Sequence, residues 1–343
     1  MRQESQGYWS AALAPDGRTA AAVDGTPGNS GSLRIWDVPT RRELALRKEK
    51  AAIRSVLFTP DGKTLITTEF DNAIRLREPR SGRVLRTLRG HSAGVNSAAL
   101  SPDGKTLYSV ANNVVKVWDL QTGKETASFE AGKQALYMIA ISPDGKLLAG
   151  GGVEKVAKIW DLASKKELKS LAGHASAIEA LAFSPDGKLL ATASWDHAVK
   201  LWDPATGREA ATLEGHPRAV LSVAFSPDGN LLATGGGNWN EQNPQPTQSG
   251  YQPASGNDEE KPEPGDLKLW DVAKRTLIGD LNGHDGQVFS VKFSRDGKTL
   301  VSASFDKSVK FWDVEKRQTV ITLPTRHEAA SKPRTALGIA FSP

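Results

Sequence analysis

The sequence predicts an all-β fold, a β-propeller of seven blades with four short antiparallel strands in each. The main observation is a Trp-Asp dipeptide that returns at intervals of 41, 41, 42, 42, 68 and 42 residues, when the degenerate copy Arg77-Glu78 is counted. The six intact pairs are Trp36-Asp37, Trp118-Asp119, Trp160-Asp161, Trp202-Asp203, Trp270-Asp271 and Trp312-Asp313. A repeat of about 40–45 residues that holds four strands is typical of a propeller blade.

A Pro-Asp-Gly turn recurs in phase with the Trp-Asp pairs. Its quartets begin at Ala14, Thr59, Ser101, Ser142, Ser184, Ser226 and Ser294, and the last has Arg in place of Pro. Proline fixes φ, aspartate caps the turn, and glycine accepts the positive φ that closes a hairpin. Apolar runs before and after each quartet predict two strands, as in 220–226 and 189–194. An alternating third strand such as 199–203 ends at Trp-Asp, and a fourth such as 208–215 follows a turn that contains glycine.

These motifs, repeated in phase, resemble those of the WD40-repeat family over nearly the whole chain. The resemblance implies a single propeller domain over 1–343. Its blades would lie near 8–49, 50–90, 91–132, 133–173, 174–215, 216–283 and 284–323. The very regular copies also resemble those of bacterial WD-repeat proteins, in which such domains often accompany others.

Two segments depart from the repeat. The 68-residue interval predicts an insertion of 26 residues in blade six, at about 238–266. Its Pro, Asn, Gln, Ser and Gly content leaves too little apolar surface to order it, so we expect a flexible flap. Residues 336–343 read as the first strand of a truncated eighth repeat. This strand favours a fragment of a longer protein, with an eight-bladed ring as the alternative.

Four of the six histidines follow a glycine, and their spacing favours a structural role over a catalytic or metal-binding one. In blade five, Thr192, Asp196 and Trp202 lie 18, 22 and 28 residues after His174. Blade seven repeats these offsets with His284, Ser302, Asp306 and Trp312. The family resemblance implies a tetrad in which Asp orients His, the hydroxyl joins the two ends and the indole N–H finds an acceptor. A network repeated in several blades is not one active site.

The other blades have incomplete tetrads. Blade three has His91, Ser109, Asn113 and Trp118; blade six keeps His216 and Thr234 but is expected to lose its Asp to the insertion; blade four has Lys133 and Gly150 in place of His and the hydroxyl. Blade two keeps Thr67 and Asp71, with Glu49 for His and Arg77 for Trp. We therefore expect Arg77 to pair with Asp71 or Glu49, and blade two to be among the least protected blades.

Composition and motifs argue against an enzyme. The chain has no cysteine, no Gly-rich phosphate loop, no Ser-His-Asp order and no zinc spacing, and the turn aspartates are explained by their turns. We expect no catalytic residue, no metal and no cofactor. No apolar run reaches 18 residues and the start is polar, so we also expect no membrane span, no signal peptide and a cytoplasmic location.

One column of the repeat varies where its neighbours stay alike, which marks it as a candidate recognition surface. Six places before the turn proline stand Trp9, Arg54, Asn96, Tyr137, Glu179, Leu221 and Phe289. The resemblance places this column at the mouth of the central channel, on the face that carries the Gly-His loops. Three loop aromatics, each just before the tetrad Asp position, support the same face: Phe70, Trp195 and Phe305. The alternative is that these aromatics pack against neighbouring loops and seal the blade junctions.

The sequence thus predicts a non-catalytic scaffold, a monomeric propeller or a module of a larger chain, that binds an unidentified partner protein at the channel mouth. A first alternative is a ligand sensor or enzyme that uses the central channel. A second is binding of RNA or an acidic partner by the basic segment 41–90, which carries Arg83, Arg86 and Arg89 at alternating positions. The net charge of +5 is too small to favour nucleic acid by itself.

Overall fold

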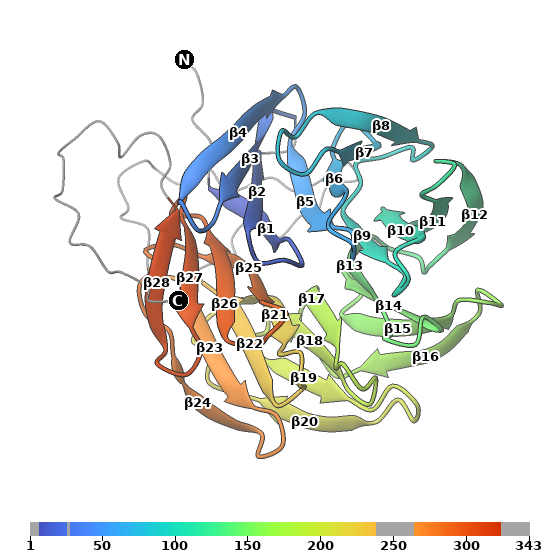
Figure 1. Ribbon diagram of the computed structural model, residues 1–343. Coiled ribbons are helices and arrows are strands. Elements are labelled where there is room, and N and C mark those ends of the chain that lie inside the picture. The colour runs from blue at the N-terminus through green and yellow to red at the C-terminus, as the bar shows by residue number, and fades with distance from the viewer. Residues whose placement is uncertain (1–6, 26–27, 238–263, 324–343) are drawn as a thin grey trace, which may run out of the picture.

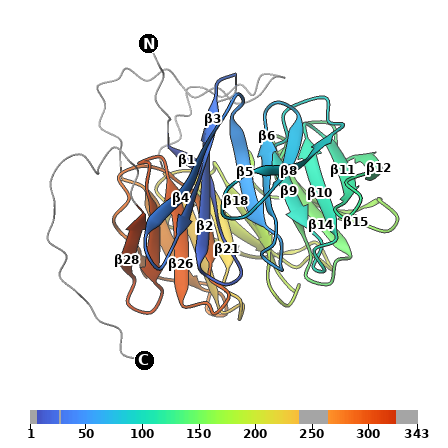
Figure 2. The same ribbon diagram turned by 45° about the horizontal axis from the view of Figure 1, so that its top comes forward.

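The computed structural model describes residues 7–25, 28–237 and 264–323, and within them it confirms the predicted propeller. Seven four-stranded antiparallel sheets stand around a central axis (Figure 1). In the view of Figure 2 the strands run between the two faces of the ring. The predicted eighth-repeat strand at 336–343 and most of the predicted insertion, 238–263, lie outside the described residues.

Each blade takes four consecutive strands, and their bounds are as follows. Blade one has β1 (Tyr8–Leu13), β2 (Thr19–Gly25), β3 (Gly31–Asp37) and β4 (Arg42–Glu49); blade two has β5 (Ile53–Phe58), β6 (Leu65–Glu69), β7 (Ala73–Arg77) and β8 (Val84–Arg89). Blade three has β9 (Ser97–Leu100), β10 (Thr106–Ala111), β11 (Val114–Asp119) and β12 (Glu125–Glu130); blade four has β13 (Leu136–Ile141), β14 (Leu147–Gly152), β15 (Val156–Asp161) and β16 (Glu167–Ala172). Blade five has β17 (Ile178–Phe183), β18 (Leu190–Ser194), β19 (Val199–Trp202) and β20 (Glu209–Leu213); blade six has β21 (Val220–Phe225), β22 (Leu231–Gly236), β23 (Asp266–Asp271) and β24 (Thr276–Asp280). Blade seven has β25 (Val288–Phe293), β26 (Thr299–Ser304), β27 (Val309–Asp313) and β28 (Gln318–Leu323).

Position in the ring determines how much of each strand is buried. The first strand of every blade lines the axis and the fourth lies at the rim (Figure 1). The second strand is covered on both faces by neighbouring blades, and all five residues of β18 are accordingly buried. The rim strand β8 has one buried residue and five exposed ones, because only its inner edge is paired. Sequence hydrophobicity follows this gradient, since apolar burial is the main favourable term in folding.

The hydrophobic core lies between the blades rather than inside any one of them. Ile159 and Leu171 of blade four pack with Ile178, Leu190 and Trp202 of blade five in one buried cluster. The next junction repeats the arrangement with Trp270 of blade six. The tryptophan of a blade therefore fills the gap toward the preceding blade, which explains its recurrence once per repeat.

Among the residues that the structure describes, the ring closes without exchange of a strand between its two ends. Blade one and blade seven each consist of their own four consecutive strands, and β1 contacts β25 and β26. The junction is filled by Tyr8 and Trp36 of blade one and by Val301 and Phe311 of blade seven. Apolar side chains thus hold blades one and seven together in the same way as they hold the other neighbouring blades together.

The face formed by the Pro-Asp-Gly turns shows one difference at the closing junction. At the six other junctions, the turn glycine of one blade faces the turn proline of the blade before it; a Cβ on Gly62 would lie 3.5 Å from Pro15 Cδ, and one on Gly297 would lie 3.4 Å from Pro227 Cδ. Gly17 would face position 295, where the proline is replaced by Arg295, and a Cβ there would meet nothing within 4 Å. The closing junction therefore lacks one packing contact that the others have.

Candidate functional site

Complete tetrads are present in blades five and seven, as the spacing predicts. His174 Nδ1 lies 2.8 Å from Asp196 Oδ2, and Nε2 lies 2.7 Å from Thr192 Oγ1, which also accepts the indole N–H of Trp202 at 2.8 Å. In blade seven the corresponding distances, among His284, Asp306, Ser302 and Trp312, are 2.7, 2.6 and 2.7 Å. Hydrogen bonds from these histidines and from backbone N–H groups outweigh burial and lower the pKa of Asp196 and of Asp306 to about 2.

Blade six also has a complete tetrad, so the expectation that its Asp is lost to the insertion is wrong. Asp266 Oδ2 lies 2.5 Å from His216 Nδ1, and Thr234 Oγ1 lies 2.6 Å from Nε2 and accepts from Trp270 Nε1 at 2.7 Å. Asp266 is the first residue of β23 and pairs with Gly236. The insertion thus comes before this carboxylate in the sequence. The pairing of β22 with β23 places Asp266 beside His216 despite the inserted residues.

Blade three retains a tetrad without the acid. His91 Nε2 lies 2.7 Å from Ser109 Oγ, which accepts from Trp118 Nε1 at 2.8 Å. Asn113 donates instead to the carbonyl of Gly132, at 2.9 Å. Burial together with the charge of Lys116 outweighs the opposing charge of Glu125 and lowers the pKa of His91 to about 4.

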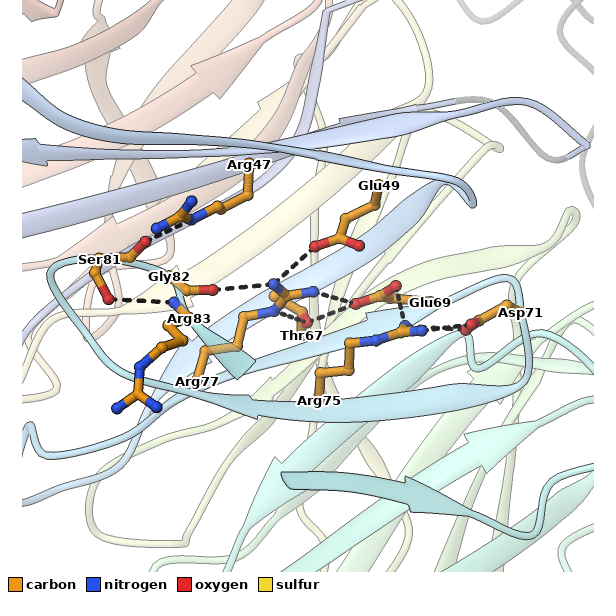
Figure 3. Close-up of polar contacts among 10 residues, drawn as sticks. All are labelled: Arg47, Glu49, Thr67, Glu69, Asp71, Arg75, Arg77, Ser81, Gly82 and Arg83. Carbon is orange, nitrogen blue, oxygen red and sulfur yellow. Dashed lines mark hydrogen bonds and ion pairs between the residues drawn. The ribbon is translucent and has the colours of Figure 1, made fainter. Parts of the chain in front are cut away.

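Blade two replaces the tetrad with a buried network of charges (Figure 3). Arg77 donates to Glu69 Oε1 at 2.8 Å and to Thr67 Oγ1 at 3.0 Å, and it also pairs with Glu49 at 2.8 Å. The predicted pairing with Glu49 is present, whereas the alternative with Asp71 is wrong. Asp71 pairs with Arg75, whose guanidinium lies between it and Glu69.

Glu69 is the residue of this network that the sequence reasoning missed. Its side chain is fully buried; burial raises its pKa, and Arg77 and Arg75 oppose the rise. The signal was available: Glu69 stands at the position of Ser194 in blade five and of Ser304 in blade seven. Blade one also has an acid in this column, Asp24, but it keeps its tryptophan. An acid here in the same blade as an Arg in the Trp column therefore indicates a compensated exchange.

Blade one has no tetrad in its described residues. Ala22 occupies the place of the hydroxyl residue, and Trp36 Nε1 has no hydrogen-bond partner among the described residues. The ring of Tyr8 meets Trp36 edge-on, with centroids 6.1 Å apart, and its hydroxyl is also buried without a partner in the described part of the chain. Blade four keeps only its tryptophan, Trp160, packed beside Gly150.

A β-bulge places most of the variable column at the channel mouth. In every blade except blade three, the register between the first two strands shifts by one residue, and the extra residue is the variable one: Trp9, Arg54, Tyr137, Glu179, Leu221 or Phe289. A bulge residue leaves the ladder and its side chain is re-aimed. Asn96 of blade three has no such shift and donates to the carbonyl of Leu136 at 2.9 Å.

The bulge residues contact one another across the ring. Arg54 NH2 of blade two lies 2.6 Å from Glu179 Oε1 of blade five, and its Cζ lies 4.7 Å from the ring centroid of Trp9. Trp9 stacks on Phe289 with centroids 5.4 Å apart. Trp9 is 7% exposed and Glu179 is 3% exposed. These side chains therefore form a packed cluster at the mouth of the channel.

The three loop aromatics are half-buried and packed over this cluster or beside a loop. Trp195 stacks on Tyr137 with centroids 6.0 Å apart, and Phe305 lies 6.5 Å from Phe289. Phe70 lies against the backbone of Gly94, where a Cβ would come within 2.5 Å of the phenyl ring. Both the predicted position near the mouth and the alternative of packing against neighbouring loops describe part of this arrangement.

The basic segment is partly committed to contacts between blades. Arg86 donates to the carbonyl of Gln121 in blade three at 2.9 Å, and Arg47 of blade one donates to the carbonyl of Ser81 in blade two at 2.7 Å. Arg89 lies 3.9 Å from Asp71. Blade seven repeats the device, because Arg317 donates to the carbonyl of Ile278 in blade six at 2.8 Å. Arg47, Arg86 and Arg317 thus join neighbouring blades at the rim, whereas the Arg89–Asp71 contact lies within blade two.

The chain belongs to the WD40-repeat family. The family profile "WD domain, G-beta repeat" matches six segments that together cover more than half of it: 43–77, 82–119, 123–161, 165–203, 207–240 and 275–313. These segments run across the blade boundaries, since each begins at or near a rim strand and all but one end at or near a Trp-Asp position.

Individual relatives match only short parts of the chain. The chain is 33% identical over 78 residues to "Periodic tryptophan protein 2 homolog" of Schizosaccharomyces pombe, covering 23% of the chain and 8% of the relative. It is 43% identical over 51 residues to "WD repeat-containing protein 3" of Mus musculus, covering 15% and 5%. "U3 small nucleolar RNA-associated protein 12" of Saccharomyces cerevisiae is 38% identical over 58 residues, covering 17% and 6%. The chain thus spans less than a tenth of each of these relatives.

Two further observations concern the described residues only. They contain no cluster of three or more His, Cys, Asp or Glu side chains arranged to hold a metal ion. They also contain no helix with the length and apolar character that a membrane crossing requires.

Proposed function

We propose that this protein is a non-catalytic scaffold that binds a partner protein on the face carrying the Gly-His loops, around the channel mouth. Support for a scaffold comes from its membership of the WD40-repeat family and from the structural use of its histidines. The finer proposal, the face, rests on the three half-buried aromatics Phe70, Trp195 and Phe305. We further propose that the protein acts in the cytoplasm, as its lack of cysteine favours.

The single observation that carries the proposed face is the bracing of these aromatics. Trp195 rests on Tyr137 and Phe305 packs on Phe289, while Phe70 is confined by Gly94. A braced aromatic loses little side-chain entropy when a partner covers it, and such residues dominate binding energy in protein interfaces. The bulge cluster beneath holds the platform in place and need not touch the partner.

The other two candidate functions have less support. A channel enzyme or sensor needs charged groups free to meet a ligand, but the two charged residues of the mouth column, Arg54 and Glu179, are paired with one another. An RNA-binding strip needs its arginines free to meet phosphates, whereas Arg86 is engaged by the blade-three turn.

The test compares two triple variants in a pull-down with quantitative mass spectrometry. One variant carries Phe70→Ala, Trp195→Ala and Phe305→Ala. The control carries Leu85→Ala, Leu168→Ala and Val320→Ala, which remove exposed apolar side chains at the rim. The proposal expects a partner retained by the wild type and by the rim variant but lost by the face variant. A partner held equally by all three proteins would reject the face.

A further inference from the structure

The channel mouth has the composition of a site for a planar cation. We propose that it is a guanidinium-binding site, which Arg54 fills in cis in the free protein and which an arginine side chain of a partner would fill in trans. This inference rests on the proposed partner-binding face and names the chemistry that the face would recognise.

Two contacts of the Arg54 side chain are of the kind that distinguishes guanidinium from ammonium. Its Cζ lies 4.7 Å from the Trp9 ring centroid, and NH2 donates to Glu179 Oε1 at 2.6 Å. A guanidinium stacks flat on an aromatic ring while its edge binds a carboxylate, whereas a lysine ammonium is a strongly hydrated point charge without a plane. The site therefore favours arginine over lysine.

Aromatic walls enclose this pair and strengthen it. Phe289 stacks on the indole of Trp9, and Tyr137 stacks on Trp195. The pKa of Tyr137 is raised by burial and by the charge of Glu179, while Arg54 opposes the rise, so the phenol lies within the field of the ion pair. Low local polarity makes the attraction between the two charges stronger than it is in water.

The acceptor groups and their occupant come from different blades. Trp9 belongs to blade one, Glu179 to blade five and Arg54 to blade two. Arg54 and Glu179 are 125 residues apart along the chain. Arg54 is a bulge residue, so only its side chain crosses the mouth and no strand pairing depends on it. Its guanidinium can leave while the backbone framework around the acceptors stays in place.

The acceptor carboxylate needs a cation. Burial raises the pKa of Glu179, and the charge and hydrogen bond of Arg54, with a contribution from Trp195, oppose the rise. Removal of Arg54 leaves a buried carboxylate without its counter-ion, an unfavourable state that an added guanidinium would relieve. This need is what makes the site testable without knowledge of the partner.

The test is chemical rescue of Arg54→Ala, read as the midpoint of thermal unfolding. Millimolar methylguanidinium is expected to raise the midpoint of the variant by about 2–4 °C while leaving the wild type unchanged. N-acetyl-arginine amide should act likewise, and methylammonium should not. The control is Arg34→Ala, because the Arg34–Glu43 pair has the same 2.6 Å contact in blade one but joins β3 to β4 away from the mouth.

The double variant Arg54→Ala, Glu179→Gln should lose the rescue, since the carboxylate is then gone. Absence of rescue in Arg54→Ala, or equal rescue in the double variant or in Arg34→Ala, would overturn the proposal. If Arg54→Ala does not fold alone, its refolding yield from urea with and without methylguanidinium gives the same comparison. If methylguanidinium fails to rescue Arg54→Ala but the face variant still loses its partner, the guanidinium site is rejected and the binding face stands. If methylguanidinium rescues Arg54→Ala but the face variant keeps its partner, the guanidinium site stands and the binding face is rejected.

Discussion

Arg77 and Glu69 form a buried ion pair, with Arg77 NH2 2.8 Å from Glu69 Oε1, at positions that hold Trp and Ser in blades five and seven. Their side chains are each 1% exposed. Two charges out of water are tolerated only because Thr67, Glu49 and Arg75 satisfy their remaining hydrogen-bonding groups. The pair shows that a different set of residues can build a closed polar network at this place, although blades one and four fold without a tetrad.

Breaking this network from one side is expected to be costly. Arg77→Ala leaves Glu69 buried without its main partner, and the free energy of unfolding should fall by about 3–5 kcal/mol. Denaturation in urea measures the change. The control is Arg77→Trp with Glu69→Ser, which places the blade-seven residues at these two positions and removes both buried charges, so it should cost much less than Arg77→Ala. A loss equal to that of Arg77→Ala would contradict the exchange of networks.

Blade two should nevertheless open more readily than blade five. Its charged network gains less on folding than the neutral contacts of a tryptophan tetrad, because desolvation offsets the attraction. Native-state hydrogen exchange of β6 amides, compared with those of β18, measures the difference. Equal protection of the two strands would refute the expectation.

His91 should make stability depend on pH between about 4 and 6.5. Its pKa in the folded protein is about 4, so between these values the unfolded chain binds the proton and the native state does not. Above pH 6.5 the ionisation of His91 does not change the free energy of unfolding. As the pH falls from 6.5 toward 4, it lowers the free energy of unfolding by up to about 3 kcal/mol. His91→Gln should flatten this part of the stability curve, measured by urea denaturation at several pH values.

A tetrad aspartate serves as the control, because its window lies lower. Asp306 has a pKa of about 2, depressed from 3.8, so its contribution is present above pH 4 and is lost as the pH falls toward 2. Asp306→Asn should therefore change the curve only below about pH 4, apart from a constant loss above it. A His91 variant that keeps the slope between pH 4 and 6.5 would mean that another group is responsible.

The two tryptophans Trp36 and Trp202 provide a matched pair. Phenylalanine in place of Trp202 removes a hydrogen bond to Thr192, whereas in place of Trp36 it removes a buried N–H that has no partner among the described residues. We expect Trp202→Phe to cost about 1 kcal/mol more than Trp36→Phe. Thermal and urea unfolding of the two variants measure the difference. Equal losses of unfolding free energy would show that the volume of the ring, and not the hydrogen bond, determines the effect.

Arg295→Pro should stabilise the protein by about 0.4–1 kcal/mol. The other six blades carry proline at this turn position, so the backbone accepts its fixed φ, and the ring would pack toward Gly17 as Pro15 packs toward Gly62. Urea unfolding measures the gain. Arg295→Ala is the control, since it removes the charge without adding the ring, and a gain of equal size would assign the effect to charge.

The fold followed from the sequence because its signal is repeated. Trp-Asp pairs and Pro-Asp-Gly turns in phase specify strand order, the number of blades and the core positions without long-range information. The complete tetrads followed for the same reason. Asp266 was lost from the prediction because offsets along the chain fail across an insertion, while β-pairing preserves position in space.

The sequence predicted which residues lie at the channel mouth but not how they contact one another. The variable column identified residues that lie together at the mouth, but it did not reveal that six of them are bulge residues. Nor could the pairing of Arg54 with Glu179 be read from the sequence, because it joins positions 125 residues apart in blades that are not neighbours. Aromatics assigned to the candidate recognition surface, such as Trp9 and Phe289, are consequently only 7% and 9% exposed.

The most direct measurement of the central claim is a hydrogen-exchange footprint of the propeller with and without the partner that it retains. The account predicts slower exchange on binding in the loops around Phe70, Trp195 and Phe305, with rim strands such as β8 and β16 unchanged. Protection confined to the rim strands, or to the turns that contain Asp61 and Asp186 on the opposite face, would contradict it.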